Sequence, residues 1–434
     1  MLDPGVTQAL EEQLTRANVA IRSGYPGERP DRQPVHTVYG GAHLFEPDTT
    51  GKLGRLALAA LERYAPTPPD FAEAVGMDPA LAEPVYERVV AKLEREPVED
   101  YRLDFEDGYG NRPDAEEDGH AAAMGRSVAD AVAAGSASPF IGIRIKPFTE
   151  ELRRRSFRTL DLFLDAMLGA GTHTVPPRFV VTLPKLTTPV HAEVMAGLLE
   201  AHEDERGLET GSLRFEIMVE TTQSIFDDEG RVAVRRQVDA GRGRCVAAHF
   251  GTYDYTAACQ VTADHQHMGH PACDFARHVM QVSLAGTGVW LSDGATNVLP
   301  VAAADDPNGR RVVHDAWRRH YRDVRHSLVH GFYQGWDLHP AQLPTRFAAV
   351  FSFFLEGIDS AGQRLRNFVG TAAQATLVGD VFDDAATGQG LLNFFLRAIN
   401  SGAITEAEAV VRSGLTLDEL RSRSFAAILA GRRS

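Results

Sequence analysis

Cysteine is scarce in this chain of 434 residues, which holds only Cys245, Cys259 and Cys273. Three cysteines form no CxxC pair and no even set of disulfides, so we expect reduced thiols in a cytoplasmic protein. Long apolar runs are missing too, because the most apolar stretch, 347–355, is about half as long as a membrane-spanning helix. The opening residues lack a basic segment followed by an apolar core, and we expect no signal peptide.

Positive charge is also in short supply. The chain has 44 Lys and Arg against 59 Asp and Glu, a formal net charge of −15. Nucleic-acid binding depends on basic patches that release counterions, so this balance argues against a nucleic-acid partner. Lysine occurs only at Lys52, Lys92, Lys146 and Lys185. Lysine at the last two positions suggests a need for a compact, titratable charge, although genome composition produces the same rarity.

What the sequence does contain is ample core material arranged in eight short apolar runs. Apolar residues make up 44% and charged residues 24%, as in ordinary globular proteins. Such runs, separated by helical patterns, are typical of a parallel sheet buried on both faces. We therefore predict an α/β fold, a (β/α)₈ TIM barrel, with a long doubly wound sheet as the alternative. The predicted strands are 35–39, 101–105, 140–145, 179–183, 213–219, 245–250, 289–291 and 331–336.

Two segments fall outside this barrel pattern. Residues 1–34 form an amphipathic helical pattern followed by a tether rich in Pro, Gly and Arg. Residues 344–434 contain several further helical patterns, including 345–355 and 390–399. We predict three parts: an N-terminal helix and tether (1–34), a catalytic barrel (35–343), and a helical cap or oligomerisation region (344–434).

Acidic and basic residues follow six of the predicted strands, at the point where each strand ends. In a TIM barrel these ends meet at one face, so the charged groups are expected to converge there. A charged residue at one strand end alone is also consistent with a solvent-exposed loop. The repetition of charged residues at six strand ends favours a functional site. The segments are LDFEDG (103–108), GIRIK (142–146), LPK (183–185), MVET (218–221), HFGTYD (249–254) and LSDG (291–294).

This ordered series resembles the HpcH/HpaI aldolase and citrate lyase β-subunit family. That family belongs to the phosphoenolpyruvate/pyruvate-binding barrel superfamily, which also holds malate synthase and malyl-CoA lyase. The resemblance runs from about residue 35 to 344 in the family's order; each motif is weak alone, and the ordered set is specific. The matching segments are LDFEDG, IRIK (143–146), LPK, VET (219–221), FGTYD (250–254) and GFYQGWDLHPAQLP (331–344).

The resemblance implies that Glu220 and Asp254 bind Mg²⁺ or Mn²⁺. Mg²⁺ prefers hard oxygen ligands and is commonly held by one or two carboxylates with water and substrate. A 2-oxo acid can chelate such an ion, which then stabilises an enolate. Two alternatives stay open: Glu220 as a buried acid paired with a lysine, and Asp254 as the N-cap of a helix starting near residue 256.

Arg144 is the expected partner of a substrate carboxylate or of the developing oxyanion, because its planar fork suits bidentate recognition. The alternative is an ion pair with Asp104 or Glu106. The same pattern assigns Glu106 to metal-bound water, and Asp107 to the orientation of Arg144 or Lys185. Asp104 faces the same side of its strand as Glu106, one layer deeper.

Lys146 and Lys185 also permit a class I aldolase mechanism, in which a lysine forms a Schiff base with the oxo group. Such an enzyme has no need for Glu220 and Asp254, so we expect Lys185 to be an ion-pair partner in an acidic barrel mouth. The residues predicted to line the substrate site are Arg144, Lys146, Gly251, Thr252 and Asp293.

A general base is not evident in the barrel motifs. In some relatives an aspartate of the C-terminal region serves, and Asp384 in GDVFDDAATGQG is the nearest match, although a helix cap is the alternative. The loop with His265, His267 and His270 departs from the family pattern. It fits a polar loop or lid over the barrel mouth, substrate contact, or a transition-metal site.

Together these residues predict a Mg²⁺-dependent carbon–carbon lyase or aldolase that forms the enolate of a 2-oxo acid or acyl-thioester. A phosphoenolpyruvate-using phosphotransferase is the second hypothesis, and a barrel retained for binding or assembly is the third. No P-loop or GxGxxG motif indicates a nucleotide. The resemblance implies a homo-oligomer, a trimer or hexamer, acting on a free 2-oxo or hydroxy acid or its CoA thioester.

Overall fold

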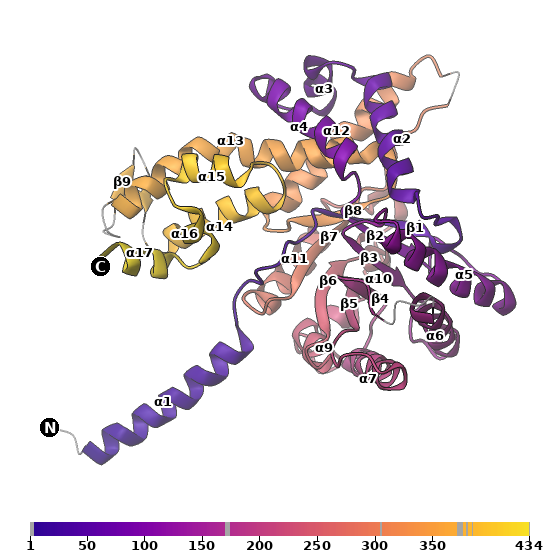
Figure 1. Ribbon diagram of the computed structural model, residues 1–434, viewed down its shortest axis with the longest axis horizontal. Coiled ribbons are helices and arrows are strands. Elements are labelled where there is room, and N and C mark those ends of the chain that lie inside the picture. The colour runs from indigo at the N-terminus through magenta and orange to yellow at the C-terminus, as the bar shows by residue number, and fades with distance from the viewer. Residues whose placement is uncertain are drawn as a thin grey trace. The chain divides into compact units, whose positions relative to one another are not determined.

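A computed structural model describes residues 4–169, 174–303, 306–370, 376–378, 381–383 and 385–433. The first eight strands form a closed barrel in chain order (Figure 1). Pairings from β3 to β7, and between β1 and β8, are parallel. The TIM barrel is therefore confirmed, and the doubly wound alternative is wrong. The strands are β1 His36–Gly41, β2 Asp100–Asp104, β3 Phe140–Arg144, β4 Phe179–Leu183, β5 Arg214–Val219, β6 Cys245–Phe250, β7 Trp290–Ala295 and β8 Gln334–Asp337.

Helices separate the strands and extend the chain at both ends. Each helical pattern expected between strands is present, as are the two expected in the C-terminal region, which lie in α13 and α14. Short helices such as α3 and α8 were not predicted, because fewer than three turns give little periodic signal. The longer helices are α1 Pro4–Gly24, α2 Thr49–Tyr64, α4 Ala82–Arg95, α5 Asp114–Ala133, α6 Arg153–Gly169, α7 Pro189–Arg206, α11 Pro271–Leu284, α12 Gly309–Val329, α13 Leu343–Gly370 and α14 Ala385–Asn400. The shorter ones are α3 Pro68–Val75, α8 Thr222–Ile225, α9 Val234–Ala240, α10 Thr252–Ala258, α15 Glu406–Ser413, α16 Leu417–Arg421 and α17 Phe425–Arg433. A further hairpin pairs β9 Thr376–Val378 with β10 Val381–Asp383.

Local sequence signals account for where these helices begin and pack. At the start of α7, the Thr188 side chain accepts a hydrogen bond from the Val190 N–H, and Pro189 occupies the first turn. The helix ends at Gly207 in the left-handed conformation. Between α5 and α6 the backbones approach closely, because a Cβ at Gly125 would lie 2.4 Å from the carbonyl oxygen of Phe163.

The chain divides into two compact units, one of residues 1–31, 39–47 and 101–295, the other of 32–38, 48–100 and 296–434. The first unit holds β3–β7 with their helices, and the second holds β8 and α12–α17. The boundaries predicted at residues 34 and 343 stay a prediction. Among the described residues, no helix is both long and apolar enough to cross a membrane.

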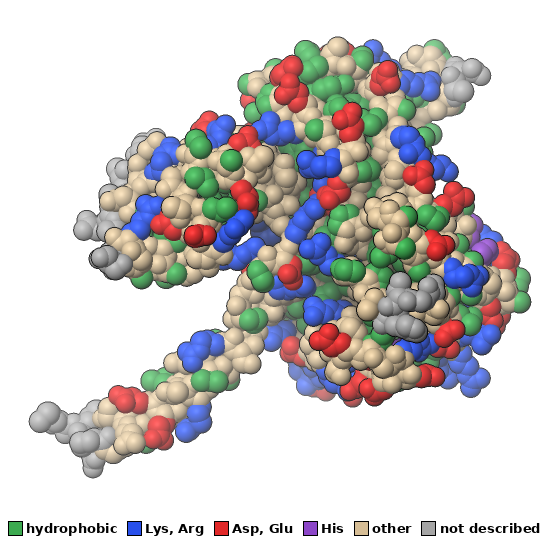
Figure 2. Space-filling view, viewed as in Figure 1, with side chains coloured by type: hydrophobic (Ala, Val, Ile, Leu, Met, Phe, Trp, Pro, Cys, Tyr) green, Lys and Arg blue, Asp and Glu red, His purple; other side chains and the backbone are tan. Residues whose placement is uncertain are grey.

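α1 differs from the other long helices in its exposure. Every residue from Gly5 to Ser23 is exposed, and the hydrophobic side chains Val6, Leu10 and Leu14 recur at four-residue spacing. Figure 2 shows hydrophobic side chains on the visible face of this helix. The amphipathic pattern expected for residues 1–34 is present, and its apolar side faces solvent.

A buried ion-pair layer fills the barrel interior of the first unit. Arg102 donates to both carboxylate oxygens of Glu216, with Nε–Oε1 3.0 Å and Nη2–Oε2 2.9 Å, and His249 Nε2 lies 3.2 Å from Oε2. The Thr182 hydroxyl donates to Oε1 at 2.5 Å. Burial favours protonation of Glu216, but the charges of Arg102 and His249 outweigh it and lower the pKa of this carboxyl.

Candidate active site

Lys185 lies at the centre of an acidic cluster in the first unit. It follows β4, and its Nζ is 2.6 Å from Glu106 Oε1, 3.3 Å from Asp107 Oδ1 and 3.5 Å from Asp254 Oδ2. Burial lowers the pKa of Lys185, but Glu106 and Glu220 outweigh it, and the pKa is raised. The lysine is therefore an ammonium ion at neutral pH, as the sequence-based expectation of an ion-pair partner requires.

The backbone of Lys185 is part of the same arrangement. Its φ is +52°, a left-handed conformation that non-glycine residues seldom adopt. Its N–H donates to Glu220 Oε1 at 2.8 Å. Such backbone strain persists only where surrounding structure holds it and is often found at functional sites. One residue thus contacts Glu220 through its backbone and three further carboxylates through its side chain.

Glu220, directly after β5, is a buried carboxyl short of positive charge. It is 1% exposed, and burial, with the nearby charges of Glu106 and Asp254, raises its pKa to about 8. The Lys185 and Arg144 charges act in the opposite direction and do not offset this effect. The alternative in which a lysine neutralises Glu220 is met only in part, since the hydrogen bond comes from the Lys185 backbone.

Gly251 leaves the space that Glu220 occupies. A Cβ at this position would lie 2.4 Å from Glu220 Oε2. Its φ of −100° is open to other residues, so the close approach, not the backbone, requires glycine. The predicted role of Gly251 in substrate binding stays a prediction, and the contact with Glu220 is an additional role.

Arg144 is held by carboxylates of the β2 end. It donates to Asp104 from Nε (2.7 Å to Oδ1) and from Nη2 (2.5 Å to Oδ2), and Nη1 lies 3.0 Å from Glu106 Oε2. Its guanidinium carbon is 4.9 Å from the ring centroid of Tyr39. The ion pair that the sequence left as an alternative is therefore present. One guanidinium nitrogen of Arg144, Nη1, nevertheless lies toward Glu106 in the acidic cluster.

Asp104 organises the turn after β2, a role that we did not predict. Besides Arg144, it accepts hydrogen bonds from the Glu106 N–H at 2.9 Å and the Gly108 N–H at 2.7 Å. Burial raises its pKa, and Arg144 with these backbone donors more than compensates, so the pKa is lowered. Asp104 thus stays charged and fixes Arg144 and the Glu106 turn together.

Asp254 and Asp107 are the exposed members of the cluster, with side chains 43% and 60% exposed. Asp254 lies in the first turn of α10, whose N-cap is Gly251. The N-cap alternative for Asp254 is therefore wrong, because the N-cap of the helix lies three residues earlier than expected. At this position the carboxylate is still favoured by the N-terminal end of the helix dipole.

The remaining predicted residues contact partners outside this cluster. Lys146 Nζ donates to the Phe105 carbonyl at 2.6 Å and lies 2.8 Å from Glu117. Asp293 is buried against Arg277, at 3.0 Å. The hydroxyl of Thr252 lies 3.0 Å from Met268 Sδ. Their substrate-binding roles stay predictions, and Asp384 lies outside the described residues.

The histidine loop does not form a three-histidine metal site. His270 Nδ1 caps α11 by accepting from the Ala272 N–H at 3.1 Å, and the His267 and His270 ring centroids are 6.0 Å apart. In the described part of the chain, the ligand atoms of His265, His267 and His270 do not all lie within 4.8 Å of one another. A polar loop is the interpretation that these contacts favour.

The sequence did not predict that two imidazoles and one phenol, those of His43, His120 and Tyr109, lie together near the ends of β1 and β2. The Tyr109 hydroxyl is 2.7 Å from His120 Nδ1, and the His43 ring packs edge-on against Tyr109 with centroids 5.5 Å apart. Burial, with the charges of Arg112 and His120, lowers the pKa of His43. The three residues lie in separate segments of the chain, and nothing in the sequence joined them.

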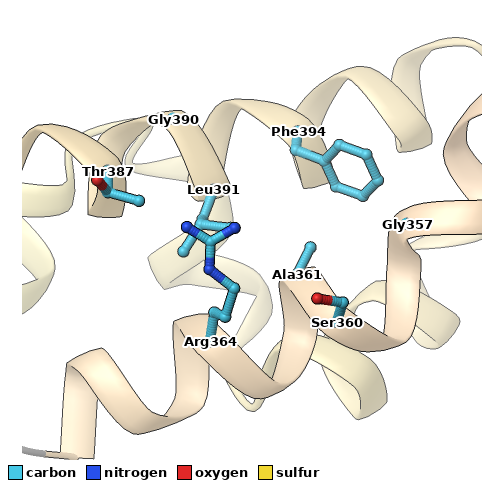
Figure 3. A pocket seen from close by; sticks show the side chains of 8 residues that line it. All are labelled: Gly357, Ser360, Ala361, Arg364, Thr387, Gly390, Leu391 and Phe394. Carbon is cyan, nitrogen blue, oxygen red and sulfur yellow. The ribbon is translucent and has the colours of Figure 1, made fainter. Parts of the chain in front are cut away.

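A separate cavity of about 410 Å³ lies between α13 and α14 in the second unit (Figure 3). Arg364 of α13 points toward Leu391 of α14 across it. No residue predicted for the active site lines this cavity. The lining residues are Gly357, Ser360, Ala361, Arg364, Thr387, Gly390, Leu391 and Phe394.

The carboxylates of the cluster suit a divalent cation by their chemistry. Glu106 Oε2 is buried and makes no hydrogen bond among the described residues, although Arg144 is near, and the pKa of Glu220 is raised to about 8 by burial and by the charges of Glu106 and Asp254. The oxygens of Glu106, Glu220 and Asp254 do not all lie within 4.8 Å of one another, as three direct ligands would. Two carboxylates with water in the remaining positions, the usual Mg²⁺ arrangement, match this set better.

Comparisons with known proteins give one family match and several structural ones. A family model described as "Domain of unknown function (DUF6986)" matches residues 14–428. A comparison with curated proteins finds no match. A citrate lyase from Burkholderia xenovorans LB400 is 20% identical with a TM-score of 0.56, covering 89% of this chain and 97% of that one. This likeness shows the barrel fold.

Malate synthase from Haloferax volcanii also aligns. The structure at 3 mM glyoxylate is 15% identical with a TM-score of 0.46, covering 91% of this chain and 99% of that one. The magnesium/glyoxylate complex is 14% identical with a TM-score of 0.45, covering 93% and 97%. At these TM-scores the two structures support no further conclusion.

Proposed function

This chain belongs to the DUF6986 family, whose description assigns no activity, and we propose that it is a carbon–carbon lyase or aldolase that depends on a divalent metal. The substrate class would be a 2-oxo or hydroxy acid, or its CoA thioester, reacting through an enolate. The observation that carries this proposal is Glu220: a buried carboxyl with a pKa raised to about 8, beside two further acids at one barrel face. A cation bound beside this buried carboxyl would stabilise its charged form.

Each residue of the cluster has a distinct part in the proposed reaction. Glu220 and Asp254 would hold Mg²⁺ or Mn²⁺, and Glu106 would hydrogen-bond its water ligands. The bound ion would supply Lewis-acid stabilisation of negative charge on the substrate oxygen. Arg144, fixed by Asp104, would orient the substrate carboxylate, since a prepositioned guanidinium needs no reorganisation during the reaction.

Proton transfer needs a further group. Asp384 stays our proposal for a base from the C-terminal region. Among the described residues, the Tyr109–His120 pair is a candidate to hold and pass a proton, because the two groups share a 2.7 Å hydrogen bond. Replacing Tyr109 by Phe would remove this contact without removing the ring.

The Schiff-base alternative is less well supported. A lysine nucleophile must be neutral, and Lys185 is an ammonium ion with three carboxylates within 3.5 Å. Lys146 is likewise engaged, 2.8 Å from the buried carboxylate of Glu117. Lys185 is surrounded by carboxylates and not by cations, and its pKa is raised, which is the opposite of what a lysine nucleophile needs. The phosphotransferase hypothesis has no observation of its own in the described residues.

A thermal-shift titration tests the proposal. Wild type is melted in EDTA and in Mg²⁺, each with and without pyruvate, oxaloacetate or glyoxylate, because a ligand that binds only the native state raises Tm. We expect the oxo acids to stabilise the protein only with Mg²⁺. Glu220→Ala and Asp254→Ala should abolish the Mg²⁺ response, while Glu193→Ala, an exposed acid on α7, should retain it. Equal stabilisation by oxo acids in EDTA would contradict metal dependence.

The homo-oligomer, a trimer or hexamer, also stays a proposal. Sedimentation equilibrium of the full chain measures it directly. A monomer at micromolar concentration would rule it out.

A further inference from the structure

We propose that Lys185 is a built-in counter-ion that competes with the divalent cation for the acidic cluster. This inference rests on the proposed metal dependence and adds a specific role for one side chain. Among the described residues, the ammonium group is the cation nearest to Glu106, Asp107 and Asp254, at 2.6, 3.3 and 3.5 Å. Two of these acids belong to the set proposed to serve the metal.

Three features of Lys185 support competition over a purely structural ion pair. Its side chain is 28% exposed, so the ammonium group can leave the cluster for water. Its backbone N–H holds Glu220 independently, so the side chain can move while Glu220 keeps its hydrogen bond. The backbone keeps a strained φ of +52°, which persists only where the surrounding structure holds that position.

The balance of charge in the cluster indicates that a bound divalent ion displaces the ammonium group of Lys185. Glu106, Asp107, Glu220 and Asp254 bring up to four negative charges, and Arg144, which pairs with Asp104, offsets only part of this charge through its 3.0 Å contact with Glu106. The Lys185 ammonium group, within 3.5 Å of Glu106, Asp107 and Asp254, supplies part of the compensating charge. When a divalent ion binds, like charges at short range repel, so the ammonium group is expected to leave Glu106 and Asp254.

Release of the charge in this way requires lysine in particular. A lysine stem is flexible and carries a compact charge, whereas a planar arginine fork would grip a carboxylate at two points. This supplies a physical reason for lysine here in a chain that has 44 basic residues and only four lysines, at 52, 92, 146 and 185.

Isothermal titration of Mg²⁺ into full-length protein tests the competition. Lys185→Met keeps the stem and removes the charge, so Mg²⁺ should bind about tenfold more tightly than to wild type. Lys185→Arg, which keeps the charge, should not tighten binding, and Lys52→Met, at an exposed site on α2, should match wild type. Equal or weaker Mg²⁺ binding by Lys185→Met overturns the inference.

The same variants separate this inference from the proposed function. If wild type binds Mg²⁺ and Lys185→Met does not bind it more tightly, only the counter-ion role fails; if neither binds, both proposals fail.

Thermal melting of the same variants provides a second readout. In EDTA, Lys185→Met should melt below wild type because the acids lose their cation, and Mg²⁺ should remove the difference. A deficit that persists in Mg²⁺ would indicate a structural role and count against the proposal.

Lysine labelling keeps the test valid if Lys185→Met does not fold. Wild type is acylated with an amine-reactive ester, and the labelled lysines are quantified by mass spectrometry. Mg²⁺ should increase labelling of Lys185, while exposed Lys52 serves as the reference and buried Lys92 and Lys146 as slow controls. Unchanged or decreased labelling of Lys185 at saturating Mg²⁺ overturns the inference.

Discussion

The backbone N–H of Lys185 donates a 2.8 Å hydrogen bond to the carboxylate of Glu220, across the ends of two neighbouring barrel strands. This single contact joins the LPK segment after β4 to the VET segment after β5. It leaves the second Glu220 oxygen beside Gly251, where a side chain would not fit. The ends of β4, β5 and β6 therefore meet at one carboxyl group.

The raised pKa of Glu220 predicts a characteristic pH dependence of stability without metal. The folded pKa, about 8, exceeds the ordinary value of 4.5, so the native state holds an extra proton between these values. The stabilising contribution is fully present below pH 4.5 and is lost as pH rises through 8. Urea denaturation in EDTA should show the stability of wild type falling relative to Glu220→Gln across this window. Parallel pH profiles of the two proteins would show that Glu220 titrates normally.

Gly251→Ala should weaken metal binding without unfolding the protein. The new Cβ would lie 2.4 Å from Glu220 Oε2, so the carboxylate must shift, while the backbone at φ −100° accepts alanine. Displacing a ligand in this way typically costs about 10- to 100-fold in metal affinity. Gly269→Ala is the matched control, because its Cβ would meet its nearest neighbour at 3.7 Å. Calorimetry should find weaker Mg²⁺ binding for the first variant alone.

The barrel was predictable from the sequence because each strand carries its own short apolar run, and eight such runs in order leave few other folds. Charged groups at strand ends were predictable for the same reason, since strand direction alone brings them to one face. Glu106, Lys185, Glu220 and Asp254 accordingly contact or influence one another. The substrate-site assignments for Lys146, Thr252 and Asp293 remain untested.

What the sequence did not reveal depends on contacts between separate segments. His43, Tyr109 and His120 come together only because two loops fold against α5, and no motif joins them. The start of α10 at Thr252 was missed because a seven-residue helix has too little periodicity, which made Asp254 resemble a cap. The bidentate hold of Asp104 on Arg144 requires a cross-strand geometry that alternation along one strand cannot supply.

Removing Arg144 should destabilise the protein more than it would at an exposed ion pair. Arg144→Met leaves Asp104 buried without its cation and Glu106 with Lys185 alone, and breaking a buried pair of this kind costs about 3–5 kcal/mol. Arg144→Lys keeps the charge but loses one of the two hydrogen bonds to Asp104, so its loss should be smaller. The free energy of unfolding from urea titration measures both. The exposed pair Arg242–Glu200 offers the control, where Arg242→Met should cost about 0–1 kcal/mol.

The last prediction concerns the packing of α5 on α6, which supports the strands that carry Glu106 and Arg144. Gly125→Ala places a Cβ 2.4 Å from the Phe163 carbonyl oxygen and 2.9 Å from the Ala166 side chain, so the helices must separate. Overpacking of this kind costs about 1–3 kcal/mol of unfolding free energy. Gly119→Ala lies on the same helix with no atom within 4 Å of the new Cβ, and should stabilise by up to about 1 kcal/mol through helix propensity. Opposite signs in the two urea titrations establish close helix contact at Gly125, whereas equal stabilisation by both substitutions would show that α5 and α6 are further apart than the structure places them.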